Sequence, residues 1–225
     1  MAHPKYLYHY TSQNGLLGIL ERKLRMTNIM YLNDSQEYDH CINIAKQEVK
    51  TCIQSLLKEE LGEIIPTKEE TISEKKFGYY KRMEHYLKDI KDHVQGEHQL
   101  FVFSFSQRKD DLSQWRGYCP EIGGFCIEFD TVKLLSVLNI VDQRTDRHSP
   151  CYFFKCSYEP DENKVLVKSF FDDVVNEIES KNEDPLIGSV GTLLNLYYSA
   201  TYVKDDSFKN EEEYRLAKKS VNNIK

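Results

Sequence analysis

Residues 100–105, with the sequence LFVFSF, decide the fold class. Aromatic and β-branched side chains dominate this stretch, and such residues favour strands over helices. We therefore expect a central strand here. The dipeptide Gly123-Gly124 precedes a second run, residues 125–129, in which Phe and Ile alternate with Cys and Glu as in a strand. A short helical stretch that contains Trp115 and Tyr118 separates the two strands.

Four further strands are expected towards the two ends of the chain. Residues 5–10 alternate weakly and are rich in Tyr, and Thr11-Ser12 then supplies hydroxyl groups that cap a helix with an apolar stripe at residues 16–20. The remaining strands are predicted at residues 24–27, 151–158 and 214–217. Strands interleaved with helices in this order predict an α+β fold.

Two long amphipathic helices are expected before the central strand. After the capping signal Asn33-Asp34-Ser35, apolar residues recur at spacings of three and four over residues 38–56. Pro66-Thr67 interrupts the pattern, which restarts over residues 77–94. The pair is predicted to form a helical hairpin inserted over residues 36–95. Further helices are expected from Asp130 to residue 138 and at residues 165–178 and 190–202.

Length and composition indicate one globular domain that spans residues 1–225. No repeat or low-complexity linker divides the chain, and its 40% hydrophobic residues are ordinary for a folded protein. No apolar run approaches the roughly 20 residues of a membrane span. The N-terminus has no secretory signal pattern, so a cytoplasmic location with six free cysteines is predicted. No paired Cys-x-x-Cys unit accompanies His148, Cys151 and Cys156, and no metal site is predicted.

The formal net charge of -6 disfavours tight, sequence-independent binding to nucleic acid. Such binding depends on Lys and Arg side chains that neutralise phosphates. A local basic patch stays open, with residues 75–82 as its candidate, although the solvated face of a helix is the better explanation of that segment. A nucleotide, another small molecule or a protein partner is the expected ligand class.

Polar and aromatic residues gather at three predicted strand edges: residues 8–12, residues 104–106 with 113–118, and residues 211–215. His9 either faces a polar pocket or completes a hydrogen bond in the core. Trp115 either anchors the core or joins Arg116 and Tyr118 in a platform on which an aromatic ring stacks. Each alternative remains open from the sequence.

Alternation in the last predicted strand groups its charged residues. Glu211, Glu213 and Arg215 would share one face, while Tyr214 and Leu216 face the core. Two carboxylates then line one side of a cleft. Their mutual repulsion is expected to raise one of the two pKa values, and the pair suits the stabilisation of positive charge in a transition state.

These motifs together resemble a bacterial family known as domain of unknown function 2971. The resemblance is carried by residues 7–12 (LYHYTS), 32–37 (LNDSQE), 103–106 (FSFS), 112–118 (LSQWRGY) and 211–215 (EEEYR). The motifs are specific as an ordered set, and they extend over nearly the whole chain. The helical hairpin is the least distinctive part.

A more distant resemblance is to the ADP-ribosyltransferase superfamily and its His-Tyr-Glu triad. It implies a mainly antiparallel sheet core and NAD as the substrate. His9 and Thr11 would bind the nicotinamide ribose and amide, and Tyr118 or Trp115 would stack on the ring. Glu213 would be the catalytic glutamate, with Glu211 positioning the acceptor. Tyr10, Ser104, Ser106 and Arg116 complete the implied NAD site.

The implied chemistry is transfer of ADP-ribose or hydrolysis of NAD. Cleavage between ribose and nicotinamide passes through an oxocarbenium-like centre, which a nearby carboxylate stabilises. The acceptor could be a protein, a nucleic acid, a small molecule or water, and such relatives suggest a toxin or a phage-defence effector. The alternative is a non-catalytic module that senses a nucleotide or binds a protein.

Overall fold

The computed structural model describes residues 3–32, 35–59, 71–90, 98–119, 123–145, 151–181 and 186–221. The chain forms two compact units. Unit 1 comprises residues 1–35, 97–158 and 204–225, and unit 2 comprises residues 36–96 and 159–203. Each unit is therefore assembled from segments that are distant in the sequence.

Unit 1 is built on a six-stranded sheet, which confirms the α+β class. Its strands are β1 (Tyr6–Thr11), β2 (Thr27–Asn28), β3 (His98–Ser106), β4 (Phe125–Asp130), β5 (Cys151–Lys155) and β6 (Glu213–Val221). The order is β4-β1-β3-β6-β5, with β2 paired to β3, and every described pairing is antiparallel. The LFVFSF stretch lies in β3, at the centre of the sheet as expected.

One face of this sheet carries the apolar core of unit 1. Its buried cluster consists of Leu7, Phe103, Phe105, Leu134, Tyr214 and Leu216. Helices α1 (Gln13–Leu20) and α6 (Thr131–Thr145) supply Ile19 and Leu138, which pack against this cluster. Because side chains alternate along a strand, the neighbours of these residues in β3 and β6 project from the opposite face.

Local capping sets where the helices of unit 1 begin. The Ser12 side chain accepts a hydrogen bond from the Gly15 N–H, and Asp130 accepts one from the Lys133 N–H at the start of α6. Asp111 caps α5 (Leu112–Tyr118) through the N–H groups of Ser113 and Gln114. Two short 3-10 helices, η1 (Ile29–Tyr31) and η2 (Asp206–Glu211), complete the unit.

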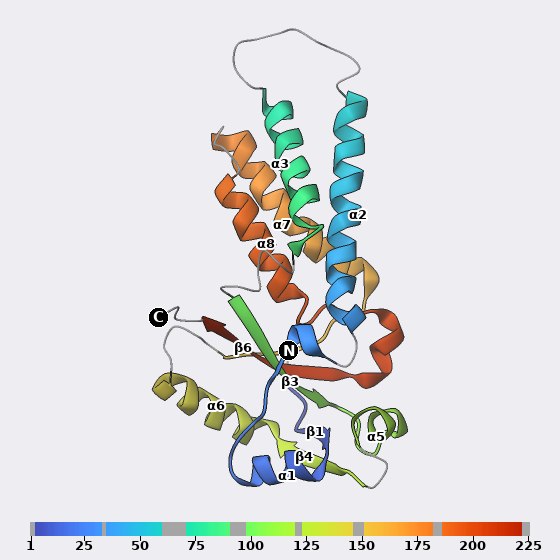
Figure 1. The fold of residues 1–225 in the computed structure, drawn as a ribbon, viewed down its shortest axis with the longest axis vertical. Helices are drawn as coiled ribbons and strands as arrows, with labels where there is room; N and C mark the ends of the chain where they lie inside the picture. The colour runs from blue at the N-terminus through green and yellow to red at the C-terminus, as the bar shows by residue number, and fades with distance from the viewer. Residues whose placement is uncertain are drawn as a thin grey trace. The chain divides into compact units, whose positions relative to one another are not determined.

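In its described residues, unit 2 contains four long helices that lie side by side (Figure 1). They are α2 (Ser35–Glu59), α3 (Ile72–Tyr86), α7 (Pro160–Lys181) and α8 (Leu186–Ser199). Their interior buries Tyr79, Met83, Phe171 and Tyr197. A capping box forms between Thr71 and Glu74 at the start of α3.

The second helix of the expected hairpin packs with two later helices, since α3 contacts both α7 and α8. The predicted strand at residues 24–27 is shorter and later than expected, at Thr27–Asn28, and the one at 151–158 ends at Lys155. Pro66, Thr67 and Val94 lie outside the described residues. Of the helices that the structure describes, none combines the length and apolarity that a membrane crossing requires.

Candidate functional site

The polar face of the unit 1 sheet is defined by strand register. Ser106 lies opposite Glu213 and Ser104 opposite Arg215 in the β3–β6 pair, and Tyr8 of β1 lies opposite Ser106. Residues opposite each other in an antiparallel pair project to the same side. These side chains therefore share the face that is turned away from the apolar cluster.

A buried ionic cluster occupies this polar face. Lys204 is fully buried, and its Nζ lies 2.5 Å from Glu211 Oε2 and 2.6 Å from Glu213 Oε2. Arg215 donates from Nε to Glu213 Oε1 at 2.7 Å and from Nη2 to Glu213 Oε2 at 3.0 Å. Each oxygen of the Glu213 carboxylate thus accepts hydrogen bonds from a buried cation.

The cluster overturns the expectation that carboxylate repulsion raises a pKa here. Burial by itself raises the pKa of Glu213, but Arg215 and Lys204 outweigh that effect and lower the pKa to about 2. Lys204 lies between the two carboxylates and replaces repulsion with attraction. No sequence signal pointed to Lys204, because nothing in its spacing from the EEEYR motif distinguishes it.

The backbone at the start of β6 is held in place by several further bonds. Glu211 ends η2 instead of lying in the strand as expected, and Glu212 has a left-handed backbone with φ 44°. The Glu213 N–H donates to Tyr158 Oη at 2.9 Å. Ser106 Oγ donates to the Glu211 carbonyl and accepts from the Arg108 N–H. The predicted site residues Ser106, Glu211 and Glu213 are thus all engaged in fixing this junction.

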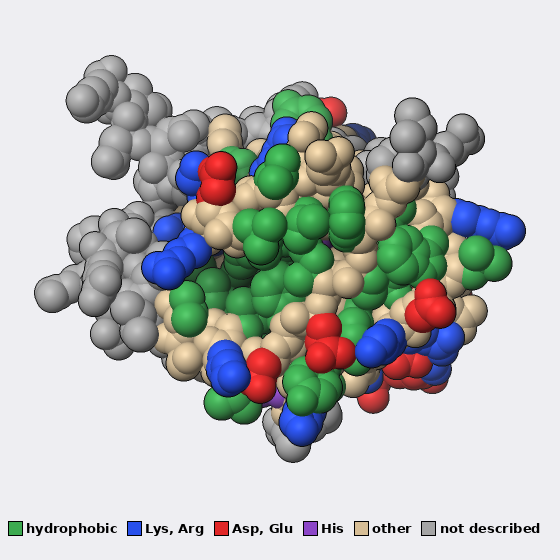
Figure 2. Space-filling view, turned by 90° about the horizontal axis from the view of Figure 1, so that it is seen from below, with side chains coloured by type: hydrophobic (Ala, Val, Ile, Leu, Met, Phe, Trp, Pro, Cys, Tyr) green, Lys and Arg blue, Asp and Glu red, His purple; other side chains and the backbone are tan. Residues whose placement is uncertain are grey.

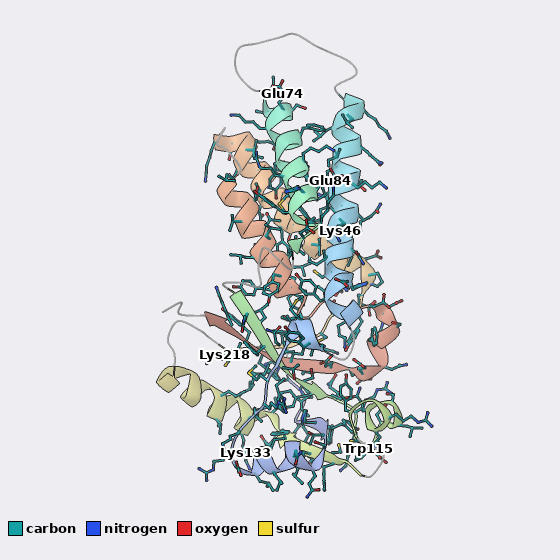
Figure 3. The ribbon with its side chains drawn as sticks, in the orientation of Figure 1. Lys46, Glu74, Glu84, Trp115, Lys133 and Lys218 are labelled. Atoms are coloured by element: carbon teal, nitrogen blue, oxygen red, sulfur yellow. The ribbon has the colours of Figure 1, made fainter. Side chains whose placement is uncertain are left out.

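Tyr10 and Trp115 fix the entry to α5. Tyr10 Oη donates to the Arg108 carbonyl and accepts from the Asp111 N–H, both at 2.8 Å. The Trp115 ring meets Tyr10 edge-on at 5.1 Å, and its Nε1 donates to Asp110 Oδ1 at 2.9 Å. Figure 3 marks the position of Trp115 at α5. Of the predicted stacking residues, Arg116 is exposed and Tyr118 is 40% exposed. Tyr10 and Trp115 therefore have structural partners.

His9 lies on the apolar face instead. Its Nδ1 is 2.8 Å from the Ser104 carbonyl, and its ring stacks on Phe103 at 4.1 Å. A carbonyl only accepts hydrogen bonds, so Nδ1 carries the proton and Nε2 is left as an acceptor in the neutral ring. Burial lowers the pKa of His9, although the bond to Ser104 opposes the shift.

Thr11 shares the face of His9 because the two residues are two positions apart in β1. Its Oγ1 is packed against α1 so closely that a Cβ at Gly15 would lie 2.0 Å away. The structure therefore separates the residues of the implied triad. His9 and Thr11 project from one face of the sheet, and Glu213, Ser104 and Ser106 project from the other.

The apolar face is hollowed. Figure 2 looks at unit 1 from the end where Figure 1 places α1, α6 and β4, and it shows a recess lined by hydrophobic side chains. The half-buried apolar residues that pack against the core cluster on this face are Ile19, Leu24, Met26, Phe129, Leu138, Cys151 and Phe153. A concave, mainly apolar surface with few polar groups is typical of a small-molecule site.

Metal ligands are not grouped in the part of the chain that the structure describes. No three His, Cys, Asp or Glu side chains come together there as a metal site requires. His148, one of the three residues weighed as ligands, lies outside the described residues.

Comparison with known sequences identifies one family. Residues 114–216 match the family described as Protein of unknown function (DUF2971). The matched segment runs from α5 to β6 and includes both the Trp115 helix and the ionic cluster, which supports the family resemblance seen in the motifs. No curated protein and no solved structure matches the chain.

Proposed function

We propose that the chain is a non-catalytic binding module whose unit 1 holds the flat ring of a small molecule, such as a nucleotide, in the hollow of the His9 face. The observation that carries this proposal is the concave apolar surface in Figure 2, on the face to which His9 contributes a neutral ring. Aromatic walls favour a flat ring by offset or edge-on stacking.

The polar contribution of the site comes from His9. With Nδ1 bound to the Ser104 carbonyl, Nε2 is the ring atom left to accept a hydrogen bond from a ligand N–H or O–H. The stack on Phe103 fixes the plane of the imidazole. Such a fixed acceptor orients a ligand while the apolar walls supply most of the binding energy.

Binding without cleavage is favoured by the position of the acidic groups. Cleavage of NAD requires a carboxylate near the ribose. None of the described strand residues that share the face of His9 is acidic, because Glu128, Asp130 and Glu213 alternate to the other side. Glu213 is also saturated by Lys204 and Arg215.

The test combines binding and turnover on the purified chain. Thermal shift and calorimetry with NAD, nicotinamide, AMP and ADP-ribose are expected to show a saturable rise in Tm for at least one of them, without nicotinamide release. Met26→Trp, which fills the hollow, should abolish that rise. Leu57→Trp, at an exposed position of α2 in unit 2, is the matched control and should preserve it.

Two results would overturn the proposal. One is the absence of any ligand-induced shift, or an equal shift in the Met26→Trp chain once circular dichroism has shown that it is folded. The other is nicotinamide release that is lost in a Glu213→Gln chain that circular dichroism shows to be folded, which would support the ADP-ribosyltransferase alternative instead.

A further inference from the structure

Two cysteines lie where α5 ends and β4 begins. Cys119 is the C-cap of α5, and its Sγ donates to the Thr11 carbonyl at 3.7 Å. Cys126 is the second residue of β4 and lies opposite Tyr10, the neighbour of Thr11, in the β1–β4 pair. The two cysteines therefore flank the same end of this strand pair.

Both thiols lie on the same side of the sheet. Cys126 shares the face of Tyr10, because they are opposite residues in the register. Helix α5 covers that face, since the Trp115 ring meets Tyr10 edge-on. Cys119 follows directly from α5, and a Cβ at Gly124, which lies two residues before Cys126 and so on the same side of the chain, would meet its Sγ. Burial raises the pKa of the Cys119 thiol, which is half-buried and not fully enclosed.

Gly124 brings the chain close enough for the two cysteines to approach. A Cβ at this position would lie 2.3 Å from Cys119 Sγ, which no side chain tolerates. Glycine therefore lets the start of β4 run directly against Cys119, two residues before Cys126.

We propose that Cys119 and Cys126 form a reversible disulfide when the protein meets a peroxide. One thiolate attacks the peroxide O–O bond, which gives a sulfenic acid and releases water after proton transfer. The second thiolate attacks the sulfenic sulfur, the S–S bond forms, and a second water leaves. Two thiols and one hydrogen peroxide thus become one disulfide and two waters.

The disulfide ties the C-terminal end of α5 to β4. It closes a short loop and so restrains the unfolded chain, which raises the stability of unit 1 when the native geometry accepts the bond. This inference does not depend on a ligand in the hollow of the His9 face. It assigns a modification site to two residues that had no function in the site described above.

The thiols of Cys41 and Cys52 in unit 2 serve as a comparison for reactivity. Cys41 is buried in unit 2, where its Sγ donates to the Leu196 carbonyl and burial raises its pKa to about 12. Cys52 is half-buried in the same unit. Reactivity follows thiolate content and access, so Cys41 should be inert.

Peptide mapping of the full chain tests the proposal. After treatment with hydrogen peroxide and blocking of free thiols, a peptide linked through Cys119 and Cys126 is expected, together with a higher Tm, and dithiothreitol should reverse both. Cys119→Ser and Cys126→Ser should each abolish the link and the Tm rise, whereas Cys52→Ser should change neither.

The proposal fails if oxidation leaves Cys119 and Cys126 unlinked in the folded protein, or links either of them to another cysteine. It also fails if the link appears only in urea, because the native contacts would then have no part in it. Circular dichroism before oxidation verifies that each Ser variant is folded.

Discussion

The two faces of the unit 1 sheet bury different kinds of side chain. The face of His9 buries aromatic and aliphatic side chains around Phe103 and Phe105 and leaves a hollow. The other face buries charge, with Lys204 held between Glu211 and Glu213. Residues that are adjacent in a motif can therefore have unrelated roles, because successive side chains along a strand point to opposite faces of the sheet.

The largest expected effect comes from breaking the charged face. Glu213→Gln removes the carboxylate that pairs with Lys204 and Arg215 and leaves buried cations only partly compensated. Breaking a buried ion pair from one side costs about 3 to 5 kcal/mol. Urea unfolding, followed by circular dichroism, should show that decrease in the free energy of unfolding.

Glu212→Gln is the matched control for that measurement. Glu212 is the adjacent residue of the same type, but its side chain is 40% exposed and pairs with Arg108 at the surface. Exposed pairs contribute about 0 to 1 kcal/mol. Equal losses in the two variants would contradict the assignment of a buried ionic cluster.

Acid should weaken the charged face selectively. The pKa of Glu213 is lowered to about 2 in the folded state, so the unfolded chain binds a proton first as the pH falls. The stabilisation is complete above pH 5 and is lost as the pH falls towards 2, by on the order of 3 kcal/mol. Denaturation midpoints measured between pH 7 and 3 should fall less steeply in Glu213→Gln. Identical slopes would contradict this role of Glu213.

Much of the fold follows from local pattern in the sequence. The LFVFSF strand, the helix start at Ser12, the Asp130 cap and the helix after Ser35 appear where periodicity and capping residues predicted them. The helix expected over residues 77–94 is instead found at Ile72–Tyr86. These features depend on neighbours a few residues away, which a single sequence records. The antiparallel sheet likewise confirms the mixed α and β class.

The candidate site could not be predicted in the same way. Residues 8–12 were expected to form one polar cluster, but His9 and Tyr10 point to opposite faces of the sheet. Lys204 meets Glu213 only through tertiary structure, and the pairing of α3 with α7 and α8 joins segments that are far apart in the chain. Strand pairing and helix packing of this kind depend on distant residues, for which local spacing has no signal.

Tyr10→Phe should have the next largest effect. The change removes the hydroxyl that bridges the Arg108 carbonyl and the Asp111 N–H, and leaving such groups unsatisfied costs about 1 to 3 kcal/mol. Tyr8→Phe, on the same face of β1 but less buried, is the control and should cost less. A larger loss in Tyr8→Phe would show that the entry to α5 is held by other contacts.

The smallest effect is expected on the apolar face. His9→Phe keeps a ring over Phe103 but removes the hydrogen bond to the Ser104 carbonyl, at a cost of about 0.5 to 1.5 kcal/mol at neutral pH. The pKa of His9 is lowered on folding, so its contribution is complete above pH 6.5 and decreases as the pH falls below that value. Unfolding at pH 7.5 and 5.5 should therefore show a smaller difference in the Phe variant than in the native chain. An unchanged difference would contradict the lowered pKa, because His9 would then bind its proton as readily in the folded chain as in the unfolded one.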